Sequence, residues 1–194
     1  MIKIGLTGSI GMGKSATAKL FLKLGVPIYD ADALVHELYK KGREGSKNIK
    51  KIFPNVISAE GNVDRDLLSK EVVGNKKKLK KLEAIIHPLL IKSRKLFFIK
   101  NKDSKLCVLD IPLLFETGGE KSVDYTVVVS TSYEIQKKRV LLRKNMTEKK
   151  FEKILSLQIP NEEKCKRADF IIDTSIDIDD AEKQVKNIII SLGF

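Results

Sequence analysis

The feature that most constrains this chain is the stretch of residues 8–15, which reads GSIGMGKS. It has the G-x-x-x-x-G-K-S spacing of a phosphate-binding loop. Residues 2–7, just before it, are short, apolar and partly β-branched, as is typical of a strand. Apolar residues then recur at helical spacing until Gly25 and Pro27. Because the motif lies between a predicted strand and a predicted helix, the chain is predicted to fold around it as an α/β protein.

The residue types in this loop suit the binding of a nucleoside triphosphate. Glycines let successive backbone amides turn toward a phosphate, and the helix that follows adds its positive end. Lys14 can reach the β- and γ-phosphates, and the hydroxyl of Ser15 can bind Mg²⁺. The residues expected to contact ATP are Gly8, Gly11, Met12, Gly13, Lys14, Ser15 and Ala16.

Length and composition limit the class of protein. A chain of 194 residues, 42% of them apolar, can bury one proper core, with or without inserted subdomains. No apolar run approaches ~20 residues, and the loop begins too early to leave room for a targeting peptide. Cys107 and Cys165 share no metal-ligand spacing, and Cys107 is expected to be a core residue. These features predict a soluble cytoplasmic protein without a membrane partner.

The formal net charge of +12 has two interpretations. It can serve polyanionic partners, either nucleic acids or phosphorylated small molecules, or it can be a lysine-rich solvated surface. Aromatic residues make up only 6% of the chain, and they do not alternate with basic residues as in single-strand binders. We therefore expect no nucleic-acid partner, and the charge leaves the oligomeric state open.

Two aspartates follow a second predicted strand, residues 26–29. Asp30 is placed to cap the next helix, and Asp32 lies within the first turn of that helix. The carboxyl ends of parallel strands are where such sheets keep their active sites. Asp32 can therefore bind Mg²⁺ through water or accept the proton of an attacking hydroxyl.

Residues 31–103 lack strand signals and are punctuated by glycines and Pro54, which predicts a helical insertion into the α/β core. One helix there carries Leu79, Leu82, Ile85 and Ile86 on one face and lysines on the other. We interpret the lysine face as the solvent-exposed face of this helix. His87 is followed by Pro88, and the proline is expected to start a new helix. An insertion of this kind is a natural place for a second substrate.

The core resumes with the apolar run 106–110, typical of a strand buried on both faces. Its last residue, Asp110, is placed like the acid that holds Mg²⁺ opposite a phosphate loop. The apolar segment 111–116 follows and ends in Glu116, where substrate binding and plain packing are both open. Residues 125–129 and 169–173 supply two more strands, and a final amphipathic helix follows.

Residues 131–167 form two charged helices between core strands, a pattern that predicts a mobile lid. Thr147 is placed to cap the second of these helices. Arg139 and Arg143 are four residues apart, so on one helix they would share a face and grip phosphate oxygens together. We name residues 131–167 the lid segment; the core is expected at 1–30, 104–130 and 168–194.

Several stretches together resemble the dephospho-CoA kinase family. They are GLTGSIGMGKS, VPIYDADALVHEL, VDRDLL, LEAIIHPL, VLDIPLLFE, QKKRVLLRK and QIPNEEKCKRADFIID, and they cover nearly the whole chain in the family's order. The resemblance implies a P-loop kinase core with five parallel strands, a helical CoA-binding insertion and a lid. It implies transfer of the γ-phosphate of ATP, with Mg²⁺, to the ribose 3′-hydroxyl of dephospho-CoA, the last step of coenzyme A synthesis.

The resemblance also assigns roles. Asp32 would be the general base, Lys14 the phosphate clamp and Arg143 the lid arginine, with Arg139 beside it; Ser15 and Asp110 would hold the metal. The residues that would hold the acceptor are Asp32, Arg65, His87, Leu113, Phe115 and Glu116. The chain departs from the family's pattern at Ala16, Thr174 and Ile176, which affects the detail of the nucleotide contacts.

Three other classes of protein are alternatives to this one. A GTPase would carry N-K-x-D after a strand; Asn101-Lys102-Asp103-Ser104 does not match it and precedes a strand. A nucleoside monophosphate kinase shares the core and lid and is the closest competitor. A nucleic-acid-dependent ATPase is the alternative outside the kinases, and it predicts steeply salt-dependent binding.

Overall fold

The computed structural model describes every residue, Met1–Phe194. The backbone separates into two compact units, which we name the core unit (residues 1–29 and 101–194) and the helical unit (residues 30–100). The insertion expected at 31–103 differs from the helical unit by one residue at its start and three at its end (31 against 30, 103 against 100). None of the helices is long and apolar enough to cross a bilayer.

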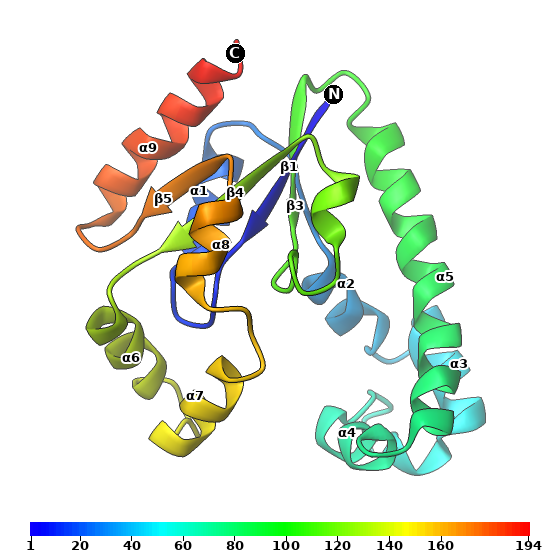
Figure 1. Cartoon of the computed structure of the whole chain (residues 1–194). Helices are drawn as coiled ribbons and strands as arrows, with labels where there is room; N and C mark the ends of the chain where they lie inside the picture. Colours follow the sequence, from blue (N-terminus) through cyan, green and yellow to red (C-terminus); the bar gives the residue numbers. More distant parts are fainter. The chain divides into compact units, whose positions relative to one another are not determined.

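A parallel sheet of five strands forms the centre of the core unit (Figure 1). In chain order its strands are β1 (Ile2–Thr7), β2 (Ile28–Asp30), β3 (Leu106–Asp110), β4 (Tyr125–Ser130) and β5 (Phe170–Asp173). Across the sheet their order is β2-β3-β1-β4-β5. β1 pairs in parallel with β3 and β4, and β5 pairs in parallel with β4. The predicted parallel α/β core is therefore confirmed.

Helices cover both faces of this sheet, which explains why β3 is an unbroken apolar run. α1 (Lys14–Lys23) packs on α9 (Ile178–Ser191), and α8 (Asn161–Arg167) packs on β4 from the opposite face (Figure 1). Phe21 of α1, Val185 of α9 and Leu6 of β1 are fully buried in one cluster. Every residue of β3 is buried, including Cys107, as the sequence predicted, and burial raises the pKa of this thiol to about 11.

Strand β5 lies at one edge of the sheet. Gln184 of α9 covers its last residue, because Gln184 Oε1 accepts from the amide of Asp173 at 2.9 Å and Gln184 Nε2 donates to its carbonyl at 2.8 Å. Both backbone polar groups of Asp173 on this side are thereby satisfied by one side chain.

The lid segment contains α6 (Tyr133–Leu141), α7 (Glu148–Leu155) and α8. Thr147 accepts a hydrogen bond from the amide of Lys150 and so caps α7, as predicted. Ser132 caps α6 in the same way through the amide of Ile135. A short 3₁₀ turn, η2 (Gly119–Ser122), precedes β4.

The helical unit consists of α2 (Ala31–Leu38), α3 (Glu44–Ile52), η1 (Pro54–Val56), α4 (Arg65–Val72) and α5 (Lys76–Lys100). It has its own apolar cluster, in which Ile49, Val56 and Leu68 are buried. Asp30 caps α2 and Asp64 caps α4, each through a carboxylate that accepts from backbone amides. The capping role expected of Asp30 is confirmed.

One boundary predicted in the helical unit is wrong. Pro88 does not start a helix; it lies inside the 25-residue α5. A proline inside a helix removes one hydrogen bond and costs about 3 kcal/mol. Ile86 before it is buried and Leu90 after it packs on the same cluster. Since a buried aliphatic side chain contributes about 1.5–3 kcal/mol, packing on both sides of the proline offsets its cost.

Candidate active site

The phosphate loop joins β1 to α1 and needs glycine at three positions for different reasons. Gly11 and Gly13 have φ of +83° and +97°, a region that side chains disfavour. A Cβ on Gly11 would meet Val140 Cγ2 at 2.5 Å, and a Cβ on Gly8 would meet the carbonyl oxygen of Val129 at 2.9 Å. Helix α6 and strand β4 therefore lie directly against the loop.

Carbonyl groups of the loop accept hydrogen bonds from residues that lie outside the loop. The carbonyl of Met12 accepts from Thr174 Oγ1 at 2.8 Å, and that of Gly13 accepts from the amides of Ala16 and Thr17, both at 3.0 Å. The amides of Gly11, Gly13, Lys14 and Ser15 make no hydrogen bond to the protein. Unused amides at the start of a helix form a nest for an anion, which is what a triphosphate requires.

Lys14 and Asp110 form an ion pair beside this nest. Their side chains are 17% and 6% exposed, so the pair is largely shielded from water. The register of β1 and β3 sets Leu6 opposite Asp110, which brings the end of β3 to the start of the loop. Two residues singled out from separate parts of the sequence thus meet in one place.

The same region offers oxygen ligands for a metal. Asp110 supplies a carboxylate and Ser15, exposed in the first turn of α1, supplies a hydroxyl. The structure contains no group of three or more His, Cys, Asp or Glu side chains that could hold a metal ion. Mg²⁺ is usually bound by one or two protein oxygens together with substrate phosphates and water, so this donor set fits Mg²⁺.

Arg139 and Arg143 are not on one helical face, which corrects the expectation from their spacing. α6 ends at Leu141, and the amide of Arg143 bonds to the carbonyl of Val140, so Arg143 lies in the turn beyond the helix. Arg139 is held by Thr174 through bonds of 2.9 Å to its hydroxyl and 2.7 Å to its carbonyl. Arg143 is exposed.

The segment after β3 is divided between surface and interior. Leu113 is exposed, whereas Phe115 is buried, with the guanidinium of Arg167 4.5 Å from its ring centroid. Glu116 Oε1 accepts from the amide of Ile159 at 3.0 Å and lies 2.7 Å from Lys164 Nζ. Burial pushes the pKa of Glu116 up, but Lys164 and the bonded amides hold this pKa below its ordinary value.

Lys164 was not identified from the sequence. Its side chain is fully buried, in a helix that reads NEEKCKR and carries no apolar stripe. A lysine in such a stretch normally belongs to solvent. Only the long-range contact with Glu116 explains its burial.

In the helical unit, Asp32, Arg65 and His87 are all exposed. Asp32 is in the first turn of α2, where the positive end of the helix favours a carboxylate. Arg65, the first residue of α4, has Nη1 3.5 Å from His36 Nδ1. Burial raises the pKa of Tyr39, and the charge of Arg65 partly opposes that rise. Arg65 is thus grouped with His36 and Tyr39, two residues that the sequence did not assign to a site.

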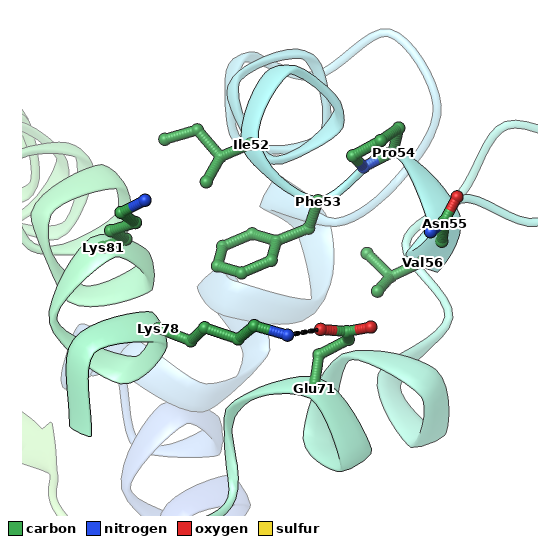
Figure 2. Close-up of a pocket in the computed structure, with 8 residues that line it drawn as sticks. All are labelled: Ile52, Phe53, Pro54, Asn55, Val56, Glu71, Lys78 and Lys81. Carbon is green, nitrogen blue, oxygen red and sulfur yellow. Dashed lines mark hydrogen bonds and ion pairs between the residues drawn. The ribbon is translucent and has the colours of Figure 1, made fainter. Parts of the chain in front are cut away.

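A small pocket of about 230 Å³ also lies within the helical unit (Figure 2). Figure 2 shows Phe53 at its centre and the ion pair of Lys78 with Glu71 along one side. Lys81 lies across the pocket from Asn55. Two members of the lysine run therefore line a concave surface, and the interpretation of that run as solvated surface is incomplete.

Comparison with known proteins gives one family. The model of the dephospho-CoA kinase family matches residues 2–180. A dephospho-CoA kinase of Bradyrhizobium diazoefficiens is 52% identical over 188 residues, which cover 96% of this chain and 93% of the relative.

Solved structures agree with this result. A Thermus thermophilus protein, TT1252, superposes with a TM-score of 0.82 at 32% identity and covers 100% of this chain and 98% of its own. The dephospho-CoA kinase of Campylobacter jejuni has a TM-score of 0.65 at 28% identity and covers 98% of this chain and 96% of its own. With the phosphate loop, the parallel sheet and a match over nearly the whole length, the chain belongs to the dephospho-CoA kinase family.

Proposed function

We propose that this protein transfers the γ-phosphoryl group of ATP to the ribose 3′-hydroxyl of dephospho-CoA, the final step of coenzyme A synthesis. The observation that carries the proposal is the phosphate loop with its unused amides and the Lys14–Asp110 pair, in a member of this family. We place the activity in the cytoplasm, because Cys107 and Cys165 are both free thiols, as is usual in a reducing compartment.

The loop and Lys14 act on the transferring group. The amides of Gly11, Gly13, Lys14 and Ser15 bind the phosphate oxygens, and Gly8, Met12 and Ala16 shape the loop around them. When a triphosphate binds, Lys14 exchanges Asp110 for the β- and γ-phosphates. Its charge then neutralises oxygens that gain negative charge during transfer.

Release of Asp110 from Lys14 gives that carboxylate a second role. Ser15 and Asp110 would hold Mg²⁺ with the phosphates, as their oxygen donors suit this ion. When bound, this ion would supply positive charge that offsets the negative charge of the phosphates. In this scheme the carboxylate of Asp110 pairs with Lys14 in the protein without nucleotide and would hold Mg²⁺ when the nucleotide is bound.

Asp32 acts on the acceptor. A ribose hydroxyl is a weak nucleophile at neutral pH and has to be aligned with the γ-phosphorus. An exposed carboxylate at the start of α2 can accept the hydroxyl proton and orient the oxygen. Asp32 thereby serves as general base, and the alternative, a metal ligand through water, is separated by the Mg²⁺ test below.

The acceptor itself is bound by residues from two segments. Arg65 and His87 supply charge and hydrogen bonds from the helical unit, and Leu113 supplies exposed apolar surface after β3. Phe115 and Glu116 support Leu113 from the interior, since their side chains are held by Arg167 and Lys164.

The lid segment supplies further positive charge for the phosphate groups. Arg143 is exposed and in a turn, so it can reach the transferring phosphoryl group when the lid closes. Arg139 is already bonded to Thr174, so it supports the nucleotide site and does not contact the transferring phosphoryl group. Thr174 also donates to Met12, so this contact accounts for one departure from the family's pattern.

The deciding experiment incubates the purified protein with ATP, Mg²⁺ and dephospho-CoA and maps the new phosphate by ³¹P NMR. A phosphate at the 3′-position supports the proposal. A panel of AMP, CMP, UMP and shikimate serves as control, and preferred phosphorylation of a nucleoside monophosphate would overturn it.

A further inference from the structure

Residue Ile10, in the phosphate loop, has both of its backbone polar groups bound by glutamine side chains. Its amide donates to Gln158 Oε1 at 3.1 Å, and its carbonyl accepts from Gln136 Nε2 at 2.7 Å. These partners are 148 and 126 residues away in the chain. Neither glutamine has a role in the function proposed above.

The two glutamines flank residues 137–157 of the lid segment. Gln136 is in α6 and is 2% exposed, and Gln158 lies between α7 and α8. Arg143 lies between them in the chain. Each end of that stretch is therefore tied to the same loop residue.

Both glutamines are held in place independently of Ile10. α6 lies close against the loop, because a Cβ on Gly11 would meet the carbonyl oxygen of Gln136 at 3.0 Å. Beside Gln158, the amide of Ile159 donates to Glu116, and Asn161 Nδ2 donates to Ser130 Oγ at 2.8 Å. The backbone beside Gln158 is therefore held by hydrogen bonds to other elements of the core unit.

Near the two glutamines a cavity separates part of the lid segment from the loop, although α6 itself lies against Gly11. A cavity of about 670 Å³ is lined by Gln136 and Gln158, by Ser9 and Met12 of the loop and by Leu155 of the lid. Because a cavity rather than packed side chains separates loop and lid here, the two glutamine bonds orient the peptide groups on either side of Ile10. The carbonyl of Ile10 and the amide of Gly11 belong to the same peptide group, so the bond from Gln136 also sets where the Gly11 amide points.

We infer that Gln136 and Gln158 are positioning residues that fix the Ile10 peptide from both ends of the lid and so align the loop amides with the transferring phosphoryl group. The inference rests on the function proposed above. It requires a donor at position 136 and an acceptor at position 158, because the two side chains bind opposite ends of one residue's backbone.

This asymmetry provides a matched pair of variants. Gln158→Glu keeps the acceptor for the Ile10 amide, whereas Gln136→Glu replaces the donor with a carboxylate facing a carbonyl oxygen. Both add the same charge beside the same residue. We expect Gln136→Glu to lower kcat about tenfold and Gln158→Glu about threefold or less, with KM for dephospho-CoA changed less than twofold in either. Gln136→Ala and Gln158→Ala should each lower kcat about three- to tenfold.

A second measurement separates this inference from the proposed function. Amide exchange by NMR, without substrates, should show faster exchange of the Ile10 amide in Gln158→Ala and little change in Gln136→Ala. If the wild-type protein fails to phosphorylate dephospho-CoA, the proposed function fails while this exchange test still stands. Equal kcat losses in the two Glu variants, or an unchanged Ile10 amide in Gln158→Ala, would overturn the inference.

Discussion

The phosphate loop and the acceptor residues of the helical unit are built in opposite ways. In the loop, the carbonyls of Ser9, Ile10, Met12 and Gly13 all accept hydrogen bonds, and a Cβ on either Gly8 or Gly11 would meet neighbouring atoms at 3.0 Å or less. In the helical unit, Asp32, Arg65 and His87 project from helices with exposed side chains.

This difference separates two tasks. Chemistry on a phosphoryl group needs fixed dipoles, so the protein builds that part from backbone that cannot rearrange. Binding of a large, flexible acceptor is met by side chains that adjust to it. Changes in the loop should therefore reduce turnover, and changes in the helical unit should weaken acceptor binding.

The largest expected effect is that of Lys14→Ala. Loss of the cation that faces the transferring phosphoryl should lower kcat about 10³–10⁵-fold. The variant also leaves Asp110 buried without its cation, so thermal unfolding has to be measured alongside activity. Lys23→Ala, on the same helix and exposed, is the matched control and should retain full activity. Near-normal turnover of Lys14→Ala would remove the loop from catalysis.

The next effect tests the acid at the start of α2. Asp32→Asn should lower kcat about 10²–10⁴-fold with near-normal affinity for both substrates, because it loses the proton acceptor. Asp66→Asn, an exposed acid in the first turn of α4, controls for helix-end charge.

Titration with Mg²⁺ distinguishes Asp32 from Asp110. Added Mg²⁺ should partly restore Asp110→Asn and leave Asp32→Asn unchanged. Restoration of Asp32→Asn by Mg²⁺ would make Asp32 a metal-site residue and not the base.

The lid gives an intermediate effect. Arg143→Ala should lower kcat about 10- to 100-fold and change the Kd for ATP much less, because the contact forms only on closure. Arg139→Ala should be milder in kcat. Steady-state kinetics with nucleotide titration checks both variants; a larger kcat loss for Arg139→Ala would reverse the assignment.

A smaller effect is expected in the helical unit. Arg65→Ala and His87→Ala should raise KM for dephospho-CoA about tenfold and leave KM for ATP within twofold, since one charge-assisted hydrogen bond is lost in each case. Arg43→Ala, exposed before α3, serves as control. If both KM values rise together, the division of tasks between the two regions is wrong.

The smallest effect concerns Glu116. Its pKa in the folded protein lies below the ordinary 4.5, so its contribution to stability is present above pH 4.5 and is lost as the pH falls through the folded value. Glu116→Gln should flatten the dependence of the free energy of unfolding on pH below about 4.5. Denaturant unfolding at pH 3–7 checks this; an unchanged slope would show that Lys164 does not stabilise the carboxylate.

Local sequence patterns predicted what local interactions determine. The phosphate loop, the parallel strands and the capping by Asp30 and Thr147 all follow from residues close together in the chain. Two predictions failed for different reasons. Tertiary packing on both sides of Pro88 outweighed its tendency to start a helix, and α6 ends before Arg143, so Arg139 and Arg143 share no helical face.

The residues that were missed are polar and act over long distances. Gln136 and Lys164 lie in charged stretches and Gln158 lies in a mainly apolar one, and the partners of all three are on other elements. Nothing in their neighbourhoods distinguishes a buried lysine or glutamine from a solvated one. In the sequence Thr174 stands out only as a departure from the family's pattern, whereas in the structure it is bonded to both Met12 and Arg139.

The cover that Gln184 provides for Asp173 bears on how this protein behaves at high concentration. Edge strands expose unpaired amides and carbonyls that can recruit a strand from another molecule and start aggregation. Strand β5 spans only Phe170–Asp173, and Gln184 already occupies both polar groups at its end. A second chain therefore finds a strand of only four residues, in which the amide and carbonyl of the last residue are already bonded. A glutamine from the last helix thus shortens the edge that is open to such pairing.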